Sequence, residues 1–436
     1  MKRETIYAQS TAFGKSAIAI IRVSGNNCKK IIKKMTSIKV LKINKAILTN
    51  IYRVGDKQNL IDKGVVTYFK GPKSYTGEDI LEISIHGGLA VCESIIRALS
   101  NSGLCRIAEA GEFTRRAHEN NKMDLIQAEA VSDLINAETD SQRVQALKLI
   151  EGRLSSKIIE IINEIKKLLA NSEANIDFVE DEIPKNLNKK IKEQNKNIIK
   201  KIDKLLNDNK IGERIRNGFK IAIIGDPNSG KSSLINYFAT RDISIVSKIP
   251  GTTRDVIELN YDLNGLPVIF YDTAGIRKKR KNIEKIGINK AIERAKNSDI
   301  NLVIIKNEKN KNKYIQFKNI IYVRSKTDLA IKRRNIINCI DISTKNGNGI
   351  SKLKKEIYKK LIFSGKNLNN ISVSRERHRK LIEKARKNLI NSQKIHQTDM
   401  KAEEIRESLK NVSKIVGKYD IEEIYDIIFN EFCIGK

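Results

Sequence analysis

The stretch that most restricts what this chain can fold into is Gly225-Asp226-Pro227-Asn228-Ser229-Gly230-Lys231-Ser232, which fits the pattern G-x-x-x-x-G-K-[ST]. The apolar run 219–224 precedes it and has the character of a buried strand, and a helical pattern begins at Ser233. A strand that turns sharply into a helix leaves unpaired N–H groups at the positive end of the helix, and these bind phosphate. We expect Lys231 to reach the β- and γ-phosphates and the Ser232 hydroxyl to contact Mg²⁺. A Gly-rich turn that holds no ligand is the alternative.

Three later segments indicate which nucleotide this loop binds. Asp272-Thr273-Ala274-Gly275 follows a second buried-strand run, where the Asp can hold the Mg²⁺ shell and Gly275 can offer its N–H to a γ-phosphate. Ser325-Lys326-Thr327-Asp328 and Ser343-Thr344-Lys345 follow in turn. This is the order of parts in a guanine-nucleotide domain, in which Asp328 accepts two hydrogen bonds from the guanine edge. Adenine has no such donor pair, so the sequence predicts GTP.

The first position of the base-binding segment departs from the usual pattern Asn-Lys-x-Asp, because Ser325 stands there. An Asn would connect the base-binding loop to the phosphate loop, and the shorter Ser can do so only weakly. We therefore predict that guanine preference is retained with reduced affinity. Thr344 stands where Ala is usual, and it should be tolerated because the contact with the base comes from the backbone.

Length and charge bound the remaining possibilities. A chain of 436 residues is too long for one compact core, so two or three domains are expected. It has no run of about 18 apolar residues and no signal region, which favours a cytoplasmic protein without a membrane span. Its five cysteines form no C-x-x-C pair, so neither a zinc site nor a disulfide framework is indicated. The net charge of +32 favours RNA binding, although a lysine-rich surface alone would give the same value.

The periodicity of the chain predicts three parts. Residues 1–119 alternate strand and helix patterns, which is typical of a small α+β domain. Residues 120–216 and 367–436 are helical in pattern, with one long helix expected across Leu147 to Leu168. Between them lies the nucleotide domain, 217–366, in which Asn264-Gly265 predicts a hairpin turn. The phosphate-binding unit is therefore expected to be inserted into a helical domain built from two separated segments.

Several motifs together resemble the MnmE (also called TrmE) family of tRNA-modifying GTPases from end to end. Outside the nucleotide domain they are residues 5–9, Arg22-Val23-Ser24-Gly25, Tyr75-Thr76-Gly77-Glu78-Asp79, His86-Gly87-Gly88, Gly111-Glu112-Phe113-Thr114-Arg115-Arg116-Ala117, residues 122–130 and Cys433-Ile434-Gly435-Lys436. The resemblance implies an N-terminal α+β folate-binding and dimerisation domain, a discontinuous helical bundle and an inserted Ras-like P-loop GTPase domain.

The resemblance also implies an activity with partners. Members of this family form homodimers and work with MnmG, an FAD protein, in a heterotetramer or larger complex. They add an aminomethyl or carboxymethylaminomethyl group to C5 of the wobble uridine of certain tRNAs. A 5-formyl- or 5,10-methylene-tetrahydrofolate supplies the one-carbon unit. The matching folate contacts in this chain are Arg22, Glu82, Lys122 and Lys436.

The family hydrolyses GTP with the help of K⁺ and Mg²⁺ rather than an arginine from a separate activating protein. The resemblance implies that Asn228, with backbone oxygens of Ser247, Ile249 and Thr252, holds K⁺ between two G domains that face each other. Ser232 and Thr253 match the Mg²⁺ ligands. The implied catalytic residues are Lys231, Glu284, which orients the attacking water, and Cys433, for which an inert thiol is an equal alternative. The full expected GTP site comprises Asn228, Ser229, Gly230, Lys231, Ser232, Ser233, Ser247, Lys248, Ile249, Pro250, Gly251, Thr252, Thr253, Asp272, Thr273, Ala274, Gly275, Ser325, Lys326, Thr327, Asp328, Ser343, Thr344 and Lys345.

Two other classes share part of this pattern. A ribosome-assembly GTPase of the Era or EngA kind has the nucleotide motifs, but it has no counterpart of Tyr75-Thr76-Gly77-Glu78-Asp79 or of the terminal Cys433-Ile434-Gly435-Lys436. A scaffold that binds nucleotide without turnover is conceivable because of Ser325. The presence of Lys231, Asp272 and Glu284 argues against it.

Overall fold

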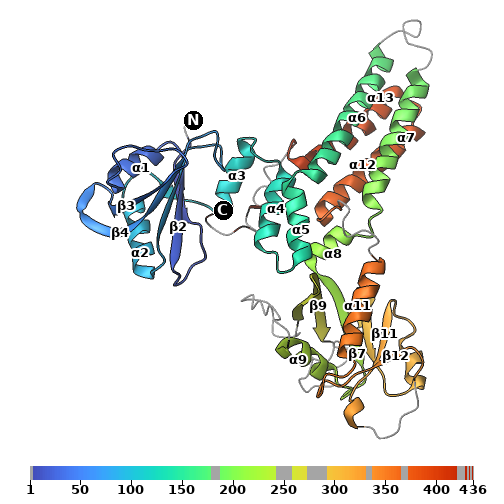
Figure 1. Cartoon of the computed structure of the whole chain (residues 1–436). Helices are drawn as coiled ribbons and strands as arrows, with labels where there is room; N and C mark the ends of the chain where they lie inside the picture. Colours follow the sequence, from blue (N-terminus) through green and yellow to red (C-terminus); the bar gives the residue numbers. More distant parts are fainter. Residues whose placement is uncertain are drawn as a thin grey trace, which may run out of the picture. The chain divides into compact units, whose positions relative to one another are not determined.

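The computed structural model describes residues 3–177, 187–241, 258–272, 292–329, 336–364 and 372–419, together with residues 428, 429, 432 and 435. The chain divides into two compact units (Figure 1). The first comprises residues 1–132 and 413–436, and the second comprises residues 133–412. No helix in the described part of the chain is both long enough and apolar enough to cross a membrane.

The first unit contains a six-stranded sheet with the strand order β3-β4-β5-β2-β1-β6. Its pairs are antiparallel, except that β6 lies parallel to β1. The strands are β1 (Ile6–Gln9), β2 (Ile18–Ser24), β3 (Ala46–Arg53), β4 (Asp56–Phe69), β5 (Ile80–His86) and β6 (Arg106–Ile107). The sheet and its flanking helices confirm the α+β class predicted for this part.

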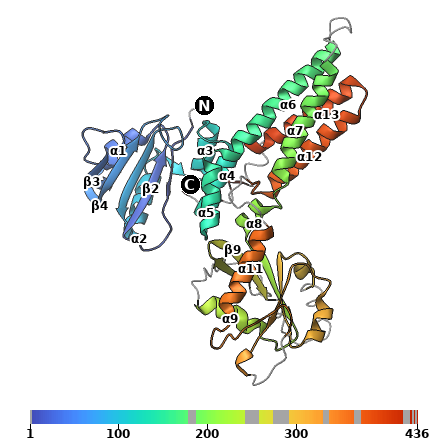
Figure 2. The ribbon, with the colours of Figure 1, turned by 45° about the vertical axis from the view of Figure 1, so that its right-hand side comes forward.

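One face of this sheet is covered by two amphipathic helices, α1 (Cys28–Met35) and α2 (Leu89–Ser100) (Figure 2). Because side chains alternate along a strand, Ile21 and Val23 point into this core while their neighbour Arg22 points to the other face. In β5, Leu81 and Ile83 are buried in the same core, and Glu82 lies opposite Arg22 in the register. The alternation therefore puts a guanidinium and a carboxylate side by side on the face that these helices leave uncovered.

Helices α3 (Glu112–Glu119) and α4 (Leu125–Ile135) follow the sheet, and the C-terminal residues of the chain pack in this same unit. Ile428, Phe429 and Phe432 form a small apolar cluster with two residues of α4, Leu125 and Ala128. The Gly435 carbonyl accepts a hydrogen bond of 3.0 Å from Ser10 Oγ, just beyond β1. Residues more than 400 positions apart in sequence are thereby neighbours in the fold.

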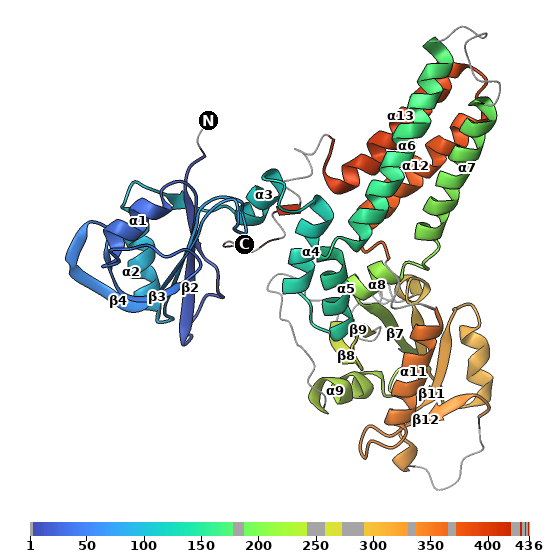
Figure 3. The same ribbon diagram turned by 45° about the horizontal axis from the view of Figure 1, so that its top comes forward.

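The second unit holds a helical bundle made from two separated segments. The first segment gives α5 (Asp140–Ile150), α6 (Arg153–Asp177) and α7 (Leu187–Leu206), and the second gives α12 (Glu376–Lys394) and α13 (Thr398–Ser413). Figure 3 shows α6 and α7 running beside α12 and α13. At one contact between the segments, buried Asn195 donates to the Leu389 carbonyl (3.1 Å) and to Ser392 Oγ (2.8 Å).

One helix prediction was wrong at this point. The apolar pattern from Leu147 to Leu168 predicted a single helix, but α5 ends at Ile150 and α6 begins at Arg153. Gly152 between them has φ of 76°, a left-handed conformation that ends a helix and that glycine adopts without steric cost. The apolar spacing continues across the break, which is why periodicity alone did not reveal it.

The inserted domain is a six-stranded sheet with the order β12-β11-β10-β7-β9-β8. Its strands are β7 (Phe219–Gly225), β8 (Glu258–Leu263), β9 (Leu266–Asp272), β10 (Ile300–Ile304), β11 (Ile320–Arg324) and β12 (Cys339–Asp341). Only the β8–β9 pair is antiparallel, and it is the hairpin predicted from Asn264-Gly265. Two helices, α9 (Lys231–Arg241) and α11 (Ile350–Ser364), share one buried core with the sheet.

The inserted domain enters and leaves the bundle through a cluster of ion pairs. The short helix α8 (Ile211–Asn217) leads into β7. Its Arg216 and the later Arg375 both donate to Asp133 Oδ1 at 2.8 Å. The segments before and after the insertion therefore share one carboxylate on α4.

Candidate functional site

The phosphate-loop motif joins the end of β7 to the start of α9, as the sequence predicts. Gly225 has φ of 157° and Gly230 has φ of 100°. A Cβ atom on Gly225 would lie 2.7 Å from the Ile304 carbonyl oxygen on the neighbouring strand β10, so a larger residue does not fit. The α9 N-terminus, with Ser232 and Ser233 in its first turn, thus faces a tightly closed loop of the kind that binds phosphate.

The Lys231 side chain is buried in this loop. Its Nζ donates to the Gly225 and Asp226 carbonyl oxygens at 2.8 and 2.9 Å. The buried Ser229 hydroxyl has no hydrogen-bond partner within the described part of the chain. A cation and an unsatisfied hydroxyl beside a helix N-terminus fit an anionic ligand.

The base-binding segment lies against the phosphate loop. Ser325 Oγ, just after β11, donates to the Ser229 carbonyl, and Lys326 Nζ donates to the Asn228 carbonyl at 3.1 Å. A Cβ on Gly230 would lie 2.8 Å from Ser325 Oγ, so the two loops are in close contact. Ser325 therefore connects the base-binding segment to the phosphate loop, although its side chain is shorter than the usual Asn and was expected to do so only weakly.

The surroundings of the Asp328 carboxyl favour its ionised form, which accepts hydrogen bonds. The hydrogen bond of 2.7 Å from Ser343 Oγ, together with nearby Lys345 and Lys326, lowers the pKa of the Asp328 carboxyl. An ionised carboxylate accepts hydrogen bonds and cannot donate them, which suits the donor edge of guanine. The Ser343–Asp328 hydrogen bond also puts the third predicted segment beside the second, and within the third segment the Lys345 N–H donates to Ser343 Oγ.

Asp272 ends β9, and its register partner on β7 is Ile223, just before the phosphate loop. Two stretches expected at this site, 247–253 and 273–275, lie outside the described residues, as does Glu284. The structure therefore brings together the phosphate loop, Asp272 and the base-binding segments. All of the K⁺ ligands, Asn228 included, and both Mg²⁺ ligands, Ser232 and Thr253, stay predictions.

One contact to the phosphate loop was not predicted. Asn310, in the 3-10 segment η2 (Glu308–Tyr314), donates from Nδ2 to Asp226 Oδ2 at 3.1 Å. Lys313 Nζ lies 4.0 Å from Asp226 Oδ1. Polar residues 84 positions downstream of the loop carry no sequence pattern that marks this pairing.

A second group of predicted residues meets on the face of the first sheet that lies opposite α1 and α2. Arg22 on β2 donates from Nε and Nη2 to the same Glu82 oxygen, Oε1, at 3.0 and 2.8 Å. Their side chains are 21% and 26% exposed, and among the described residues Arg22 Nη1 and Glu82 Oε2 have no hydrogen-bond partner. One donor and one acceptor thus remain for a ligand, a combination that fits the pterin N–H edge and a carboxylate.

The other predicted folate contacts are only partly described. Lys122 Nζ donates to the Pro72 carbonyl at 2.9 Å, in the loop that also carries Tyr75. Lys436 and Cys433 lie outside the described residues. The contact between Gly435 and Ser10 puts the C-terminal segment beside the N-terminal sheet.

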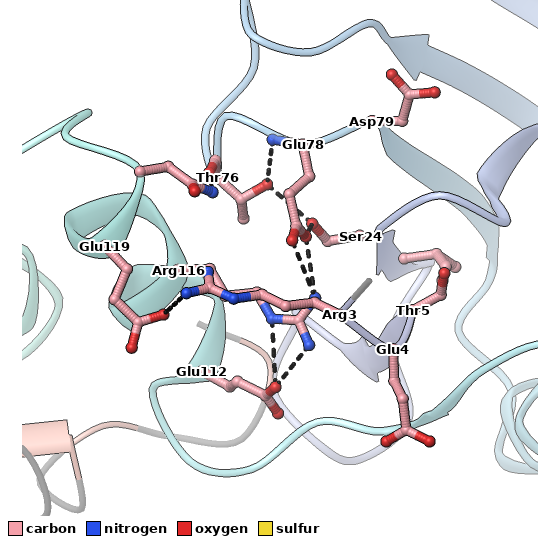
Figure 4. Close-up of polar contacts among 12 residues, drawn as sticks. Arg3, Glu4, Thr5, Ser24, Thr76, Glu78, Asp79, Glu112, Arg116 and Glu119 are labelled. Carbon is pink, nitrogen blue, oxygen red and sulfur yellow. Dashed lines mark hydrogen bonds and ion pairs between the residues drawn. The ribbon is translucent and has the colours of Figure 1, made fainter. Parts of the chain in front are cut away.

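A buried charge network connects the end of β2, the segment 75–79 and helix α3 (Figure 4). Arg116 on α3 donates to both Glu78 oxygens (3.3 and 3.0 Å) and, from Nη2, to Glu112 Oε1 (2.8 Å). Ser24 Oγ donates to Glu78 Oε2 at 2.7 Å, and Arg106 donates to both oxygens of Glu112 at 2.8 Å. Burial opposes ionisation of Glu112, but these donors outweigh it and lower the pKa of its carboxyl.

Comparisons with known proteins follow this division into parts. A family model described as the MnmE helical domain matches residues 125–433, and one described as the N-terminus of the GTP-binding protein TrmE matches residues 5–122. The chain is 43% identical over 451 residues to the "tRNA modification GTPase MnmE" of Pelagibacter ubique, covering 99% of this chain and 100% of the relative. It is 39% identical over 449 residues to the protein of the same name from Rickettsia prowazekii, with the same coverage.

Two solved structures are similar to part of the chain. Era bound to MgGDPNP and a 16S ribosomal RNA fragment is 26% identical, with a TM-score of 0.26, over 32% of this chain and 56% of that one. The G domain of the Thermotoga maritima FeoB iron transporter is 22% identical, with a TM-score of 0.26, over 33% of this chain and 98% of that one. The assignment rests instead on the family models and the full-length relatives: the chain belongs to the MnmE family of tRNA modification GTPases.

Proposed function

We propose that this protein is a K⁺-activated GTPase that works with MnmG to modify C5 of the wobble uridine of certain tRNAs. The observation that carries the GTPase part is the contact between the phosphate loop and the base-binding segment, made by Ser325 and Lys326, beside an ionised Asp328. Full-length similarity to relatives named as tRNA modification GTPases supports the tRNA substrate.

In the proposed GTP site, each residue acts on charge or geometry. Lys231 leaves the loop carbonyls that it now contacts and neutralises charge on the β- and γ-phosphates. Ser232 and Thr253 hold Mg²⁺, with Asp272 nearby. Asn228, with backbone oxygens of Ser247, Ile249 and Thr252, holds K⁺, which when bound offsets charge that develops between the phosphates. Glu284 orients the attacking water.

In the proposed folate site, Glu82 accepts from the N–H edge of the pterin, and Arg22, Lys122 and Lys436 meet the carboxylates of the tetrahydrofolate. Either 5-formyl- or 5,10-methylene-tetrahydrofolate fits this set of donors and acceptors. The tetrahydrofolate, when bound, supplies the one-carbon unit. Cys433 is proposed to take part in the chemistry at the C-terminal end of the chain.

The proposal includes an assembly. Two copies dimerise through their N-terminal domains, their G domains meet when GTP and K⁺ are bound, and MnmG joins in a heterotetramer or larger complex in the cytoplasm. The proposed domains are residues 1–119, a helical domain from 120–216 and 367–436, and the G domain at 217–366. Hydrolysis is coupled to the meeting of the two G domains.

Nucleoside analysis of tRNA tests this function. Cells that lack the protein should lose the C5 substituent of the wobble uridine, and the wild-type gene should restore it. A Lys231→Ala gene, which cannot neutralise the phosphates, should not. Unchanged wobble nucleosides in the deletion strain, together with a defect in ribosome assembly, would favour an Era-like switch instead.

A further inference from the structure

Two sequence motifs of this chain contain none of the proposed catalytic or ligand-binding residues. One is Tyr75-Thr76-Gly77-Glu78-Asp79, and the other is Gly111-Glu112-Phe113-Thr114-Arg115-Arg116-Ala117. In the structure, each contributes an aromatic ring next to the Arg22 guanidinium. We propose that Tyr75 is a positioning residue for the folate site, which holds Arg22, together with Phe113, in the orientation that binds the ligand. This inference rests on the proposed folate-binding function.

Both rings lie close to the Arg22 guanidinium. Its carbon Cζ lies 5.6 Å from the centroid of the Tyr75 ring and 5.8 Å from that of Phe113. Both distances are within the range in which a guanidinium is attracted to the face of an aromatic ring. Glu82 contacts the same guanidinium through Oε1 alone. A single carboxylate oxygen leaves the guanidinium free to rotate about it, and the rings restrict that rotation.

Tyr75 is itself fixed. Its hydroxyl shares a hydrogen bond of 2.8 Å with Thr114 Oγ1, on the same helix as Phe113. Burial raises the pKa of Tyr75, although the Thr114 hydrogen bond and the Arg22 charge oppose the increase, so the ring stays a neutral phenol at physiological pH. The Tyr75 ring also packs against the apolar cluster that contains Phe113.

The buried charge network connects the two segments that carry these rings. Arg116, which is 4% exposed, is paired with Glu78 from the first motif and with Glu112 from the second (Figure 4). Asn120 Nδ2 adds a hydrogen bond of 2.6 Å to the Thr76 carbonyl. The two motifs are therefore connected by buried polar contacts, and Tyr75 and Phe113 are the residues of these motifs whose rings lie next to Arg22.

The test is a folate-binding titration of the full-length protein with 5-formyl-tetrahydrofolate. Tyr75→Leu removes the ring and keeps an apolar side chain, and it should weaken binding by about 3- to 10-fold, as expected for one partly exposed cation–π contact. Tyr75→Phe keeps the ring and should stay within about twofold of wild type. Tyr52→Leu makes the same change in strand β3 of the same sheet, where Tyr52 hydrogen-bonds to Ser37 and Asn50, and should leave binding unchanged.

A double-mutant cycle separates positioning from general packing. In the Arg22→Ala background, Tyr75→Leu should weaken binding no further, because the group that it positions is gone. Equal effects of Tyr75→Leu in both backgrounds, or equal losses for Tyr75→Phe and Tyr75→Leu, would overturn the inference. GTP turnover and the melting temperature of each variant report folding, and Tyr75→Met replaces Tyr75→Leu if the latter does not fold.

The outcome for Arg22 separates this inference from the function on which it rests. If Arg22→Ala binds the folate more weakly than wild type does, but Tyr75→Leu binds it like wild type, the site stands and the role of Tyr75 is refuted. If the wild type does not bind the folate, or Arg22→Ala binds it equally well, the folate site itself is refuted, and the inference with it.

Discussion

The contact between the base-binding segment and the phosphate loop can be tested at Ser325. Its hydroxyl donates to the Ser229 carbonyl, and Ser325→Ala removes that donor without adding bulk. The Lys326 contact with the Asn228 carbonyl remains in this variant. The substitution therefore removes one of the two described hydrogen bonds by which the base-binding segment contacts the phosphate loop.

The size of the effect follows from the type of bond. A hydrogen bond between neutral groups contributes about 0.5–1.5 kcal/mol, and each 1.4 kcal/mol changes a Kd about tenfold. We therefore expect the Kd for GTP to rise by about 2- to 12-fold. The lower half of this range is favoured because the Lys326 contact persists.

The assay is a titration with a fluorescent GTP analogue. The matched control is Ser298→Ala in the same domain, where the hydroxyl also donates to a backbone carbonyl, that of Arg294, at 2.7 Å but away from the nucleotide loops. This control should leave the Kd within about twofold of wild type. An unchanged Kd for Ser325→Ala, or an equal change in both variants, would refute the tethering role of Ser325.

Three further outcomes are expected. Arg116→Met should lower the stability of the first unit by about 3 kcal/mol, because it leaves the buried Glu78 carboxylate without its cation. Calorimetry should show that the Tm falls by about 6–12 °C. The control Arg97→Ala removes an exposed ion pair and should change the Tm little. Folding lowers the pKa of Glu112, so its ionised carboxylate stabilises the fold fully above about pH 4.3, the ordinary pKa of Glu. This stabilisation is lost as the pH falls through the lower pKa of the folded state. Glu112→Gln should remove the corresponding part of the acid-induced loss of stability, measured by urea unfolding at pH 3–6, and an unaltered pH profile would contradict this expectation. Glu284→Ala should bind GTP like wild type and fail to hydrolyse it, so retained turnover would remove Glu284 from the mechanism.

Much of the fold could be predicted from local patterns. Residues 79–85 alternate in polarity, a pattern that distinguishes the two faces of β5, and Asn264-Gly265 predicted the β8–β9 hairpin. The first half of β4 (Asp56–Phe69) could not be predicted in this way. The early β4 residues, such as Lys57 and Asn59, are polar and exposed, so they do not show the apolar alternation that marks a half-buried strand.

Contacts between distant segments could not be predicted from the residues alone. Arg116 and Glu78 are 38 positions apart, and no spacing rule pairs them. The same holds for Asn310 and Asp226 at the phosphate loop. The phosphate and base-binding motifs were recognisable because their chemistry requires particular residue types in order. The supports around them use hydrogen bonds that many polar residues can make, and these depend on the completed fold.

The central claim is that a potassium ion assists GTP hydrolysis at the Asn228 loop, and the most direct test is GTP turnover in KCl and in NaCl at equal ionic strength. An arginine in the corresponding place contributes about 10³–10⁵ in rate, so turnover should be at least about tenfold faster in potassium. Asn228→Ala should lose this difference. Equal rates in the two salts for the wild-type protein would contradict the account.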